Sequence, residues 1–140
     1  MKSLLLVLAI TTIQPSFSSE DPGPFVFSYA ACKDMTGRAN LKAIAYGVGW
    51  TKLEAETSAL YNVQLNFGCG GRGPIIVESA TVTSQKNSNY CVAACVGFDG
   101  VDNRYTRGGT GRNLTEAKYS ALHETQVAFG CGEIQIVTCQ

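Results

Sequence analysis

Small apolar residues recur every four positions in two segments of the chain. The members of the two series, in order, are Ala55, Ala59, Val63 and Phe67, and then Ala117, Ala121, Thr125 and Phe129. Side chains four residues apart lie on the same side of a helix, so each series predicts one apolar helix face. Two alanines at the start of each series would let the helix backbone lie close to a sheet.

The ends of both helices are also marked. Thr51 lies three residues before Glu54, and Asn113 lies three residues before Glu116, which is the spacing of a capping box. A glycine follows the last phenylalanine of each series, as is typical of a helix C-cap. We therefore expect one helix to begin after Thr51 and the other after Asn113.

Short runs of β-type residues flank the predicted helices. In the first half they are residues 25–32, 41–47 and 75–83, and the last run of the second half is 134–139. The polar, glycine-containing stretch 33–40 predicts a loop between the first two strands. Residues 99–103 lack the spacing and the final glutamate of an EF-hand calcium loop, and we interpret them as a hairpin turn.

The chain contains the same unit twice. Residues 47–70 align without a gap with residues 109–132, and 12 of the 24 pairs are identical. This period predicts two copies of one strand-strand-helix-strand unit. The expected fold class is α+β, with antiparallel sheet or sheets, two helices and three disulfides. We assign residues 1–18 to a signal peptide, 19–84 to the first unit and 85–140 to the second, the two units forming one compact pseudo-symmetric domain.

The first residues are typical of a secretory signal. A basic start at Lys2 precedes an apolar run over residues 4–10, and small residues follow at Ser16 and Ser18. The run is too short to span a membrane, and no second run of spanning length follows it. The alternative is a buried N-terminal strand or helix. We expect a secreted protein, extracellular or, in a bacterium, periplasmic.

The cysteine content predicts disulfides. The chain has six cysteines, all after the predicted signal, and an even set in an exported chain indicates three bonds. They are Cys32, Cys69, Cys91, Cys95, Cys131 and Cys139. Because there is no close Cys-x-x-Cys pair and only one histidine, we expect neither a metal site nor a cofactor.

The repeat predicts which cysteines pair. Cys32 and Cys69 are the only cysteines of the first unit, and their counterparts are Cys95 and Cys131. Equivalent positions should form equivalent bonds, which leaves Cys91 to pair with Cys139. The counterparts of these last two cysteines in the first unit are both serine.

Several short motifs resemble a known family. The run Ala43-Ile44-Ala45-Tyr46, a glycine pair, Glu54-Ala55, Ala59-Leu60 and the helix-ending cysteine resemble a small secreted domain-of-unknown-function family, known mainly from bacterial exported proteins. Cys131 followed by Cys139, and Cys91 within Cys-Val-Ala-Ala, are similar to that family's other cysteines. The first unit has Val77 where the family has cysteine, and the second has Arg104-Tyr105-Thr106-Arg107 in place of Ala-Ile-Ala-Tyr. The resemblance implies the fold and export, and no activity.

Charge excludes some partners. The whole chain has a formal net charge of +0, and without Lys2 the mature chain carries one net negative charge. Nucleic-acid binding and polybasic membrane anchoring both need a basic surface, so we expect neither.

Candidate ligand-binding residues lie near the helix N-termini. Arg104, Arg107 and Arg112 surround the Gly-x-Gly of the second unit, where an anion could bind, although the glycines alone could serve to form a bend. Trp50 could anchor a partner or stack on a sugar, or equally pack over the helix start. Asn113 is an acceptor for N-linked glycan in a eukaryote and doubles as a helix cap.

Catalysis is not expected. Glu54 and Glu116 are explained as capping residues, and His123 lies on the side of its helix opposite the apolar face. The cysteines are committed to bridges, and no serine has a nucleophile motif. We therefore expect a secreted disulfide-stabilised binding or interaction module for an extracellular protein or glycan. The alternative is a secreted effector, such as a toxin, an antimicrobial protein or a protease inhibitor.

Overall fold

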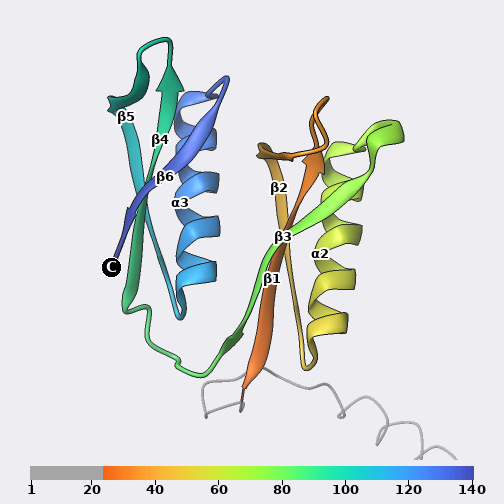
Figure 1. Ribbon diagram of the computed structural model, residues 1–140. Helices are drawn as coiled ribbons and strands as arrows, with labels where there is room; N and C mark the ends of the chain where they lie inside the picture. Colours follow the sequence, from red (N-terminus) through yellow and green to blue (C-terminus); the bar gives the residue numbers. More distant parts are fainter. Residues whose placement is uncertain (1–23) are drawn as a thin grey trace, which may run out of the picture.

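The computed structural model describes residues 24–140 (Figure 1), so the predicted signal peptide, residues 1–18, lies outside the described residues. The elements of the first unit are β1 (Phe25–Lys33), β2 (Ala39–Gly49), α2 (Lys52–Phe67), the short 3-10 helix η1 (Gly70–Arg72) and β3 (Pro74–Val82). Those of the second unit are β4 (Asn89–Gly97), β5 (Gly100–Gly111), α3 (Leu114–Phe129) and β6 (Ile134–Cys139).

Each unit forms its own antiparallel sheet of three strands. The first sheet has the order β2-β1-β3, and the second sheet has the order β5-β4-β6. In each unit a hairpin leads into a helix that returns the chain to the free edge of the first strand, as a right-handed crossover would. The predicted α+β class, with two helices and three disulfides, is confirmed, and the strands form two sheets rather than one.

Both helices begin at the predicted caps. The side chain of Thr51 accepts a hydrogen bond from the backbone N–H of Glu54 at 3.2 Å, and Asn113 Oδ1 accepts one from Glu116 at 2.8 Å. The glycine after each helix has left-handed φ, 53° and 58°, and donates its N–H to a carbonyl of the last turn. Capping residues therefore determine both ends of each helix.

The Gly-x-Gly glycines bring each helix close to its own sheet and do not form a bend. They lie inside β2 and β5 and have no positive φ. A Cβ added to Gly47 would lie closer than 3.0 Å to the backbone of Ala59, and one added to Gly109 would meet the backbone of Ala121 as closely. Any side chain at these glycines would therefore push the helix away from the sheet.

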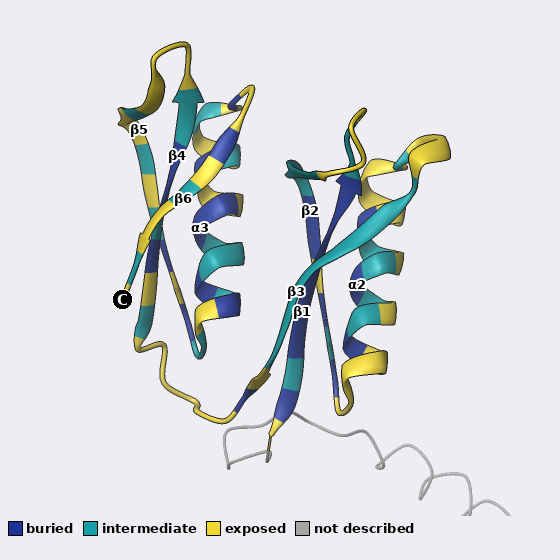
Figure 2. Cartoon of the chain, viewed as in Figure 1, coloured by how far each residue is buried: buried dark blue, intermediate teal, exposed yellow. Residues whose placement is uncertain are grey.

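The elements stack in four layers. Figure 1 shows, in order, the second sheet, α3, the first sheet and α2, with the two units in the same orientation. Helix α3 contacts β4, β5 and β6 on one side and β1, β2 and β3 on the other, so it lies between the two sheets. Among the described residues nothing covers the outer face of the second sheet or the outer side of α2 (Figure 2).

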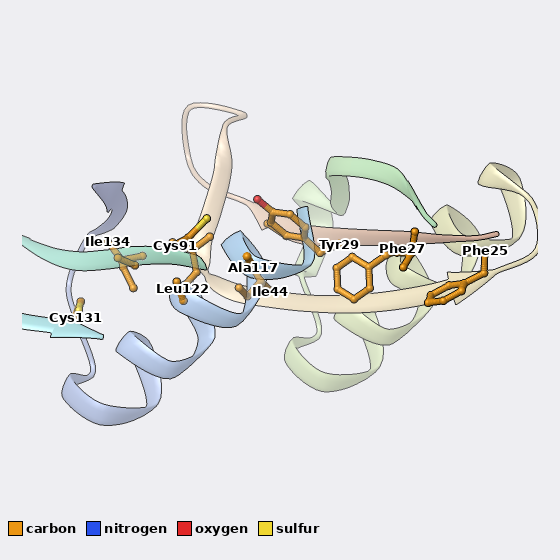
Figure 3. Packing of buried hydrophobic residues seen from close by; sticks show 13 residues of the cluster. Phe25, Phe27, Tyr29, Ile44, Cys91, Ala117, Leu122, Cys131 and Ile134 are labelled. Carbon is orange, nitrogen blue, oxygen red and sulfur yellow. The ribbon is translucent and has the colours of Figure 1, made fainter. Parts of the chain in front are cut away.

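Two hydrophobic clusters follow from this stacking. The smaller one lies between α2 and the first sheet and includes Ala59 and Val63. The larger one spans both units (Figure 3), with Phe27 and Tyr29 of β1 in the same cluster as Leu122 of α3. The core therefore sits mainly on both sides of α3, and its larger part belongs to neither unit alone.

The predicted apolar helix face is correct at its start and wrong at its end. Ala55, Ala59 and Val63 are fully buried, but Phe67 is 47 % exposed. Four residues advance slightly more than one turn, so a series with this spacing drifts around the helix by about 40° per step. By its fourth member the series has turned away from the sheet, and Phe129 in α3 is likewise only half-buried.

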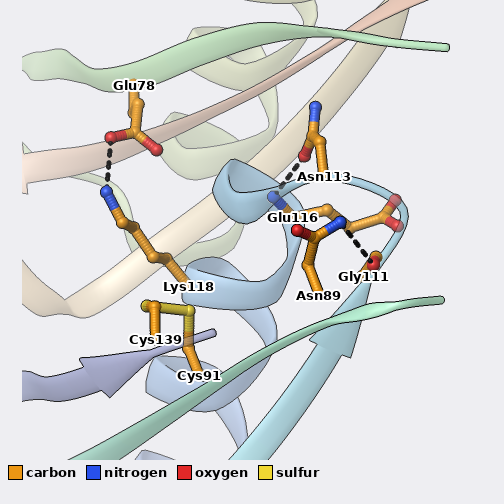
Figure 4. Close-up of a disulfide and its surroundings, with 8 residues drawn as sticks. All are labelled: Glu78, Asn89, Cys91, Gly111, Asn113, Glu116, Lys118 and Cys139. Carbon is orange, nitrogen blue, oxygen red and sulfur yellow. Dashed lines mark hydrogen bonds and ion pairs between the residues drawn. A yellow bond between two sulfur atoms is a disulfide. The ribbon is translucent and has the colours of Figure 1, made fainter. Parts of the chain in front are cut away.

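The disulfides join the pairs that the repeat predicts. Cys32 is bonded to Cys69, Cys95 to Cys131 and Cys91 to Cys139. Cys91 and Cys139 face each other directly in the pairing of β4 with β6, close to α3 (Figure 4).

The first unit has a hydrogen bond where the second has its additional disulfide. Ser28 and Ser79 are the counterparts of Cys91 and Cys139, and they face each other in the same way in the pairing of β1 with β3. Their hydroxyl oxygens lie 2.8 Å apart, and Ser79 also donates to Glu56 of α2 at 3.0 Å. The two units therefore close the same strand pair by different chemistry.

Candidate functional site

A cleft of about 320 Å³ opens where α3 meets the edge of the first sheet. We call it the inter-unit cleft, because both units contribute to it. Its lining residues are Phe27, Tyr46, Thr110, Arg112, Glu116, Tyr119, Ser120, His123 and Glu124.

A row of aromatic rings forms one wall of the cleft. The rings of Phe27 and Tyr46 are stacked with centroids 5.4 Å apart, and the edge of Tyr119 meets Tyr46 at 5.3 Å. His123 continues the row, because its ring lies parallel to that of Tyr119 at 5.8 Å. Phe27 is buried, but Tyr46 is 48 % exposed and His123 is exposed, so the row presents aromatic surface to solvent on both sides of Tyr119.

Burial moves the ionisation of the central phenol of this row to higher pH. Desolvation, with a smaller contribution from Tyr46, raises the pKa of Tyr119 to about 12. Tyr29, which also contacts Tyr119, has its pKa raised by burial and by the nearby charge of Glu78. Tyr119 and Tyr29 therefore keep their protons into the alkaline range.

An ion pair forms the charged part of the cleft. Arg112 Nε donates to Glu116 Oε1 at 2.9 Å, and the backbone N–H of Arg112 donates to the same oxygen at 2.8 Å. The guanidinium also lies 4.7 Å from the ring centroid of Phe25 in β1. Arg112 therefore joins the start of α3 to the first sheet.

The two partners of this ion pair stabilise each other's charge. Burial by itself raises the pKa of the Glu116 carboxyl, but the hydrogen bonds and charge of Arg112 outweigh it and hold that pKa below its ordinary value. The hydrogen bond that Arg112 donates to Glu116 is the chief cause that raises the pKa of Arg112. An added anion would have to compete with Glu116 for this guanidinium.

Of the four residues suggested by the sequence as ligand-binding, only Arg112 lines the cleft. Arg104 Nη2 lies 2.9 Å from Asp102 Oδ2, and the Arg107 guanidinium lies 4.6 Å from the ring centroid of Phe129. Arg104 and Arg112 are eight residues apart in extended chain, about 26 Å, so the three arginines do not form one anion site. Trp50 lies at the N-terminus of α2, outside the cleft, and is 48 % exposed.

Asn113 has structural partners in both units. Its Oδ1 caps α3, and its Nδ2 donates to the carbonyl of Thr81 at 3.2 Å and to that of Ala80 at 3.5 Å. A glycan attached to Nδ2 would occupy the side of the amide that faces these β3 carbonyls. Glycosylation at Asn113 stays a prediction.

The glutamates at equivalent positions of the two units each accept a backbone hydrogen bond at the start of their own helix. Glu54 Oε2 accepts the backbone N–H of Trp50, as Glu116 accepts that of Arg112, so each carboxylate is used at its own helix start. Each bond goes to the residue before the N-cap rather than to the N-cap itself, as the usual capping box has it. Within residues 24–140 no group of three His, Cys, Asp or Glu side chains could hold a metal ion, and no helix could span a membrane.

Sequence reasoning did not find the aromatic wall of the cleft. It treated α3 as a helix with one apolar face and His123 as a residue on the opposite, solvated side. Tyr119 on that opposite side was the available signal, because a large aromatic residue away from the alanine face indicates a second packing surface.

No protein-family model matches the chain, and neither a curated protein nor a solved structure was found to be similar to it. The function is therefore argued from the geometry of the chain itself.

Proposed function

We propose that this protein is a secreted, disulfide-stabilised binding module and that its inter-unit cleft binds an extracellular glycan. The observation that carries the proposal is the aromatic row Tyr46, Tyr119 and His123, which ends in exposed rings. Small-ligand sites combine apolar and aromatic walls with a few placed polar groups.

The rim of the cleft supplies such polar groups. Ser120 and Thr110 offer hydroxyls, and Glu124 is exposed one residue beyond His123. A sugar ring has an apolar face that can stack on an aromatic ring and hydroxyls that can bond to groups beside it. Arg112 is already neutralised by Glu116, so an uncharged sugar fits better than an acidic one.

Export is supported by independent features. The predicted signal precedes a chain whose six cysteines are all in disulfides, and such bonds persist in oxidising compartments. The motif resemblance to a family of exported proteins supports the same location. The compact, cross-linked build suits a module that presents a surface outside the cell.

The proposal predicts glycan binding that depends on His123 and Glu124. The oxidised mature protein should bind a class of neutral oligosaccharides on a glycan array, and His123→Ala and Glu124→Ala should each weaken binding about tenfold, or about 1.4 kcal/mol. Both side chains are exposed, so neither change should disturb folding. Affinities are then measured by titration calorimetry.

Tyr105→Ala is the matched control. Tyr105 is 42 % exposed and packs edge-on against Phe129, at the other end of α3 from the cleft. Its removal should leave glycan affinity unchanged. An absence of glycan binding, or equal loss in Tyr105→Ala and His123→Ala, would contradict the proposal.

A further inference from the structure

Helix α2 carries an apolar stripe on the side that faces away from its own sheet. The stripe consists of Trp50, Leu53, Thr57, Tyr61 and Leu65. Leu53, Thr57 and Tyr61 follow one another at four-residue spacing and share one side of the helix. Leu65 lies about 120° around the helix axis from Leu53, and Trp50 precedes the first residue of the helix. Leu53, Tyr61 and Leu65 are 75 %, 66 % and 68 % exposed, and a hollow lined by Leu53, Thr57 and Tyr61 follows the stripe. Three large apolar side chains in a row are more than scattered exposure explains.

The equivalent side of α3 packs against the first sheet. Thr115 and Tyr119 are the counterparts of Leu53 and Thr57. Thr115 is buried, and Tyr119 packs edge-on against both Phe27 and Tyr46 of the first sheet. Lys118 adds a 3.0 Å ion pair to Glu78 of β3. Leu53 of α2 is thus exposed where its more polar counterpart Thr115 is covered, whereas His123 and Val127, the counterparts of Tyr61 and Leu65, are exposed in α3 as well.

A matching sheet face is open at the other end of the molecule. Cys91 and Ala93 of β4 are buried in the cluster that contains Ala117 and Ala121 of α3, so Tyr90 and Val92 between and beside them point outward. The strand pairing places Thr138 beside Val92 on the same face, and Thr106 lies on this face of β5. We call Tyr90, Val92, Thr106 and Thr138 the open sheet face. It corresponds to the face of the first sheet that receives α3.

We propose that the α2 stripe of one molecule docks on the open sheet face of a second copy, repeating between molecules the contact of α3 with the first sheet. The contact joins two different surfaces, so both remain available at the two ends of a dimer. Such a head-to-tail interface extends into a chain of molecules unless the rotation closes it into a ring.

Side-chain size and charge are compatible with this contact. Within the molecule, the large Tyr119 packs on Tyr46. In the proposed contact between molecules, Thr57 takes the place of Tyr119 and Gly108 takes the place of Tyr46. Both are smaller, and the ring of Tyr90 lies over Gly108. None of the residues named for the α2 stripe or the open sheet face is charged. Glu54 also lines the hollow beside the stripe, and Arg104 lies on the same face of β5 as Thr106, so the nearest charges on the two surfaces are of opposite sign.

Two face-specific double variants test the proposal. Leu53→Arg with Tyr61→Arg blocks the stripe, and Thr106→Arg with Thr138→Arg blocks the open sheet face. Analytical ultracentrifugation should show wild-type protein associating with rising concentration, and each variant alone remaining monomeric. An equimolar mixture should form a 1:1 heterodimer and nothing larger, because each variant keeps the surface that the other lacks. Both variants gain positive charge, so simple attraction cannot produce the heterodimer.

Other outcomes overturn the proposal. Wild-type protein that stays monomeric up to ~1 mM has no such contact of useful affinity. Continued association of the Thr106→Arg, Thr138→Arg variant would indicate stripe-to-stripe pairing instead. A mixture that stays monomeric would exclude head-to-tail docking. Circular dichroism confirms that each variant is folded. His123 and Glu124 belong to neither surface, so failure here would not affect the glycan proposal.

Discussion

Asn113 shows how one side chain can serve both its own helix and the neighbouring unit. Its Oδ1 caps α3 while its Nδ2 bonds to Ala80 and Thr81 of β3. Thr51, its counterpart, caps α2 with a hydroxyl. We expect Asn113→Ala to lose both functions and to lower the free energy of unfolding by about 2 kcal/mol, roughly 1 for the cap and 1 for the inter-unit bonds.

Asn113→Thr separates the two contributions. It installs the cap of the first unit and keeps no amide, so only the inter-unit part, about 1 kcal/mol, should be lost. Thr51→Ala, which removes a cap alone, is the matched comparison. Urea unfolding curves measure all three variants. An Asn113→Thr protein as stable as wild type would show that the amide bonds to β3 contribute nothing.

The ionisation of Tyr119 at alkaline pH should report the packing of α3 against the first sheet. Burial raises its pKa to about 12 from an ordinary 10.0. The folded state holds the proton more tightly than the unfolded state, so this contribution to stability is intact below pH 10 and is lost as the pH rises toward 12. In an absorbance titration of the six tyrosines, Tyr119 should ionise late together with Tyr29.

The variant Tyr119→Phe identifies that late step. It keeps most of the ring contact and removes the phenol, so the late absorbance change should fall by one tyrosine. Tyr61→Phe on α2 is the control, because Tyr61 is exposed and lies outside the contact between α3 and the first sheet, so its loss should leave the late step of Tyr119 unchanged. If Tyr119 ionises at its ordinary pKa of 10.0, the contact between α3 and the first sheet is looser than described.

At the scale of elements, the strand pairs β1–β3 and β4–β6 are closed by interchangeable chemistry. We expect Ser28→Cys with Ser79→Cys to form a fourth disulfide, because these residues face each other as Cys91 and Cys139 do. The residues joined are 51 apart, so the bond should stabilise the protein by roughly 4 kcal/mol on the chain-entropy account.

Replacing the disulfide of the second unit with serines tests the same equivalence in the other direction. Cys91→Ser with Cys139→Ser should still fold, with a serine pair like that of the first unit, and should lose a similar free energy. Peptide mapping and denaturant unfolding measure both changes. Free thiols at positions 28 and 79 under oxidising conditions would contradict the equivalence of the two strand pairs.

Elements and bridges were predictable from the sequence because they depend on local or repeated patterns. The caps at Thr51 and Asn113 follow from three-residue spacings, and the disulfide pairs follow from comparing the units. The order of the layers was not predictable, because it depends on which outward faces meet. Tyr46 and Tyr119 are 73 residues apart and share no short-range pattern, so the cleft that they line became visible only in three dimensions.

At the scale of the whole molecule, the hydrophobic core does not follow the boundary between the two repeat units. The sequence boundary predicted at residues 84 and 85 lies between β3 and β4, but the larger hydrophobic cluster joins β1 of the first unit to α3 of the second. Helix α3 packs against both sheets, whereas α2 packs against the first sheet alone. This difference leaves α2 with an exposed apolar side and leaves the second sheet uncovered among residues 24–140.

The stack also explains how the two copies diverged. Gly47 and Gly109 are identical, and each packs against its own helix. Tyr46 and Tyr119 touch across the units, and neither of their counterparts, Gly108 and Thr57, is aromatic. The same position of the repeat lies at the contact between the units in one copy and away from it in the other, so it meets different neighbours in the two copies. Positions that are identical in the two copies, such as Gly47 and Gly109, therefore mark contacts within a unit. Positions that differ, such as Tyr46 and Gly108, mark the contact between the units.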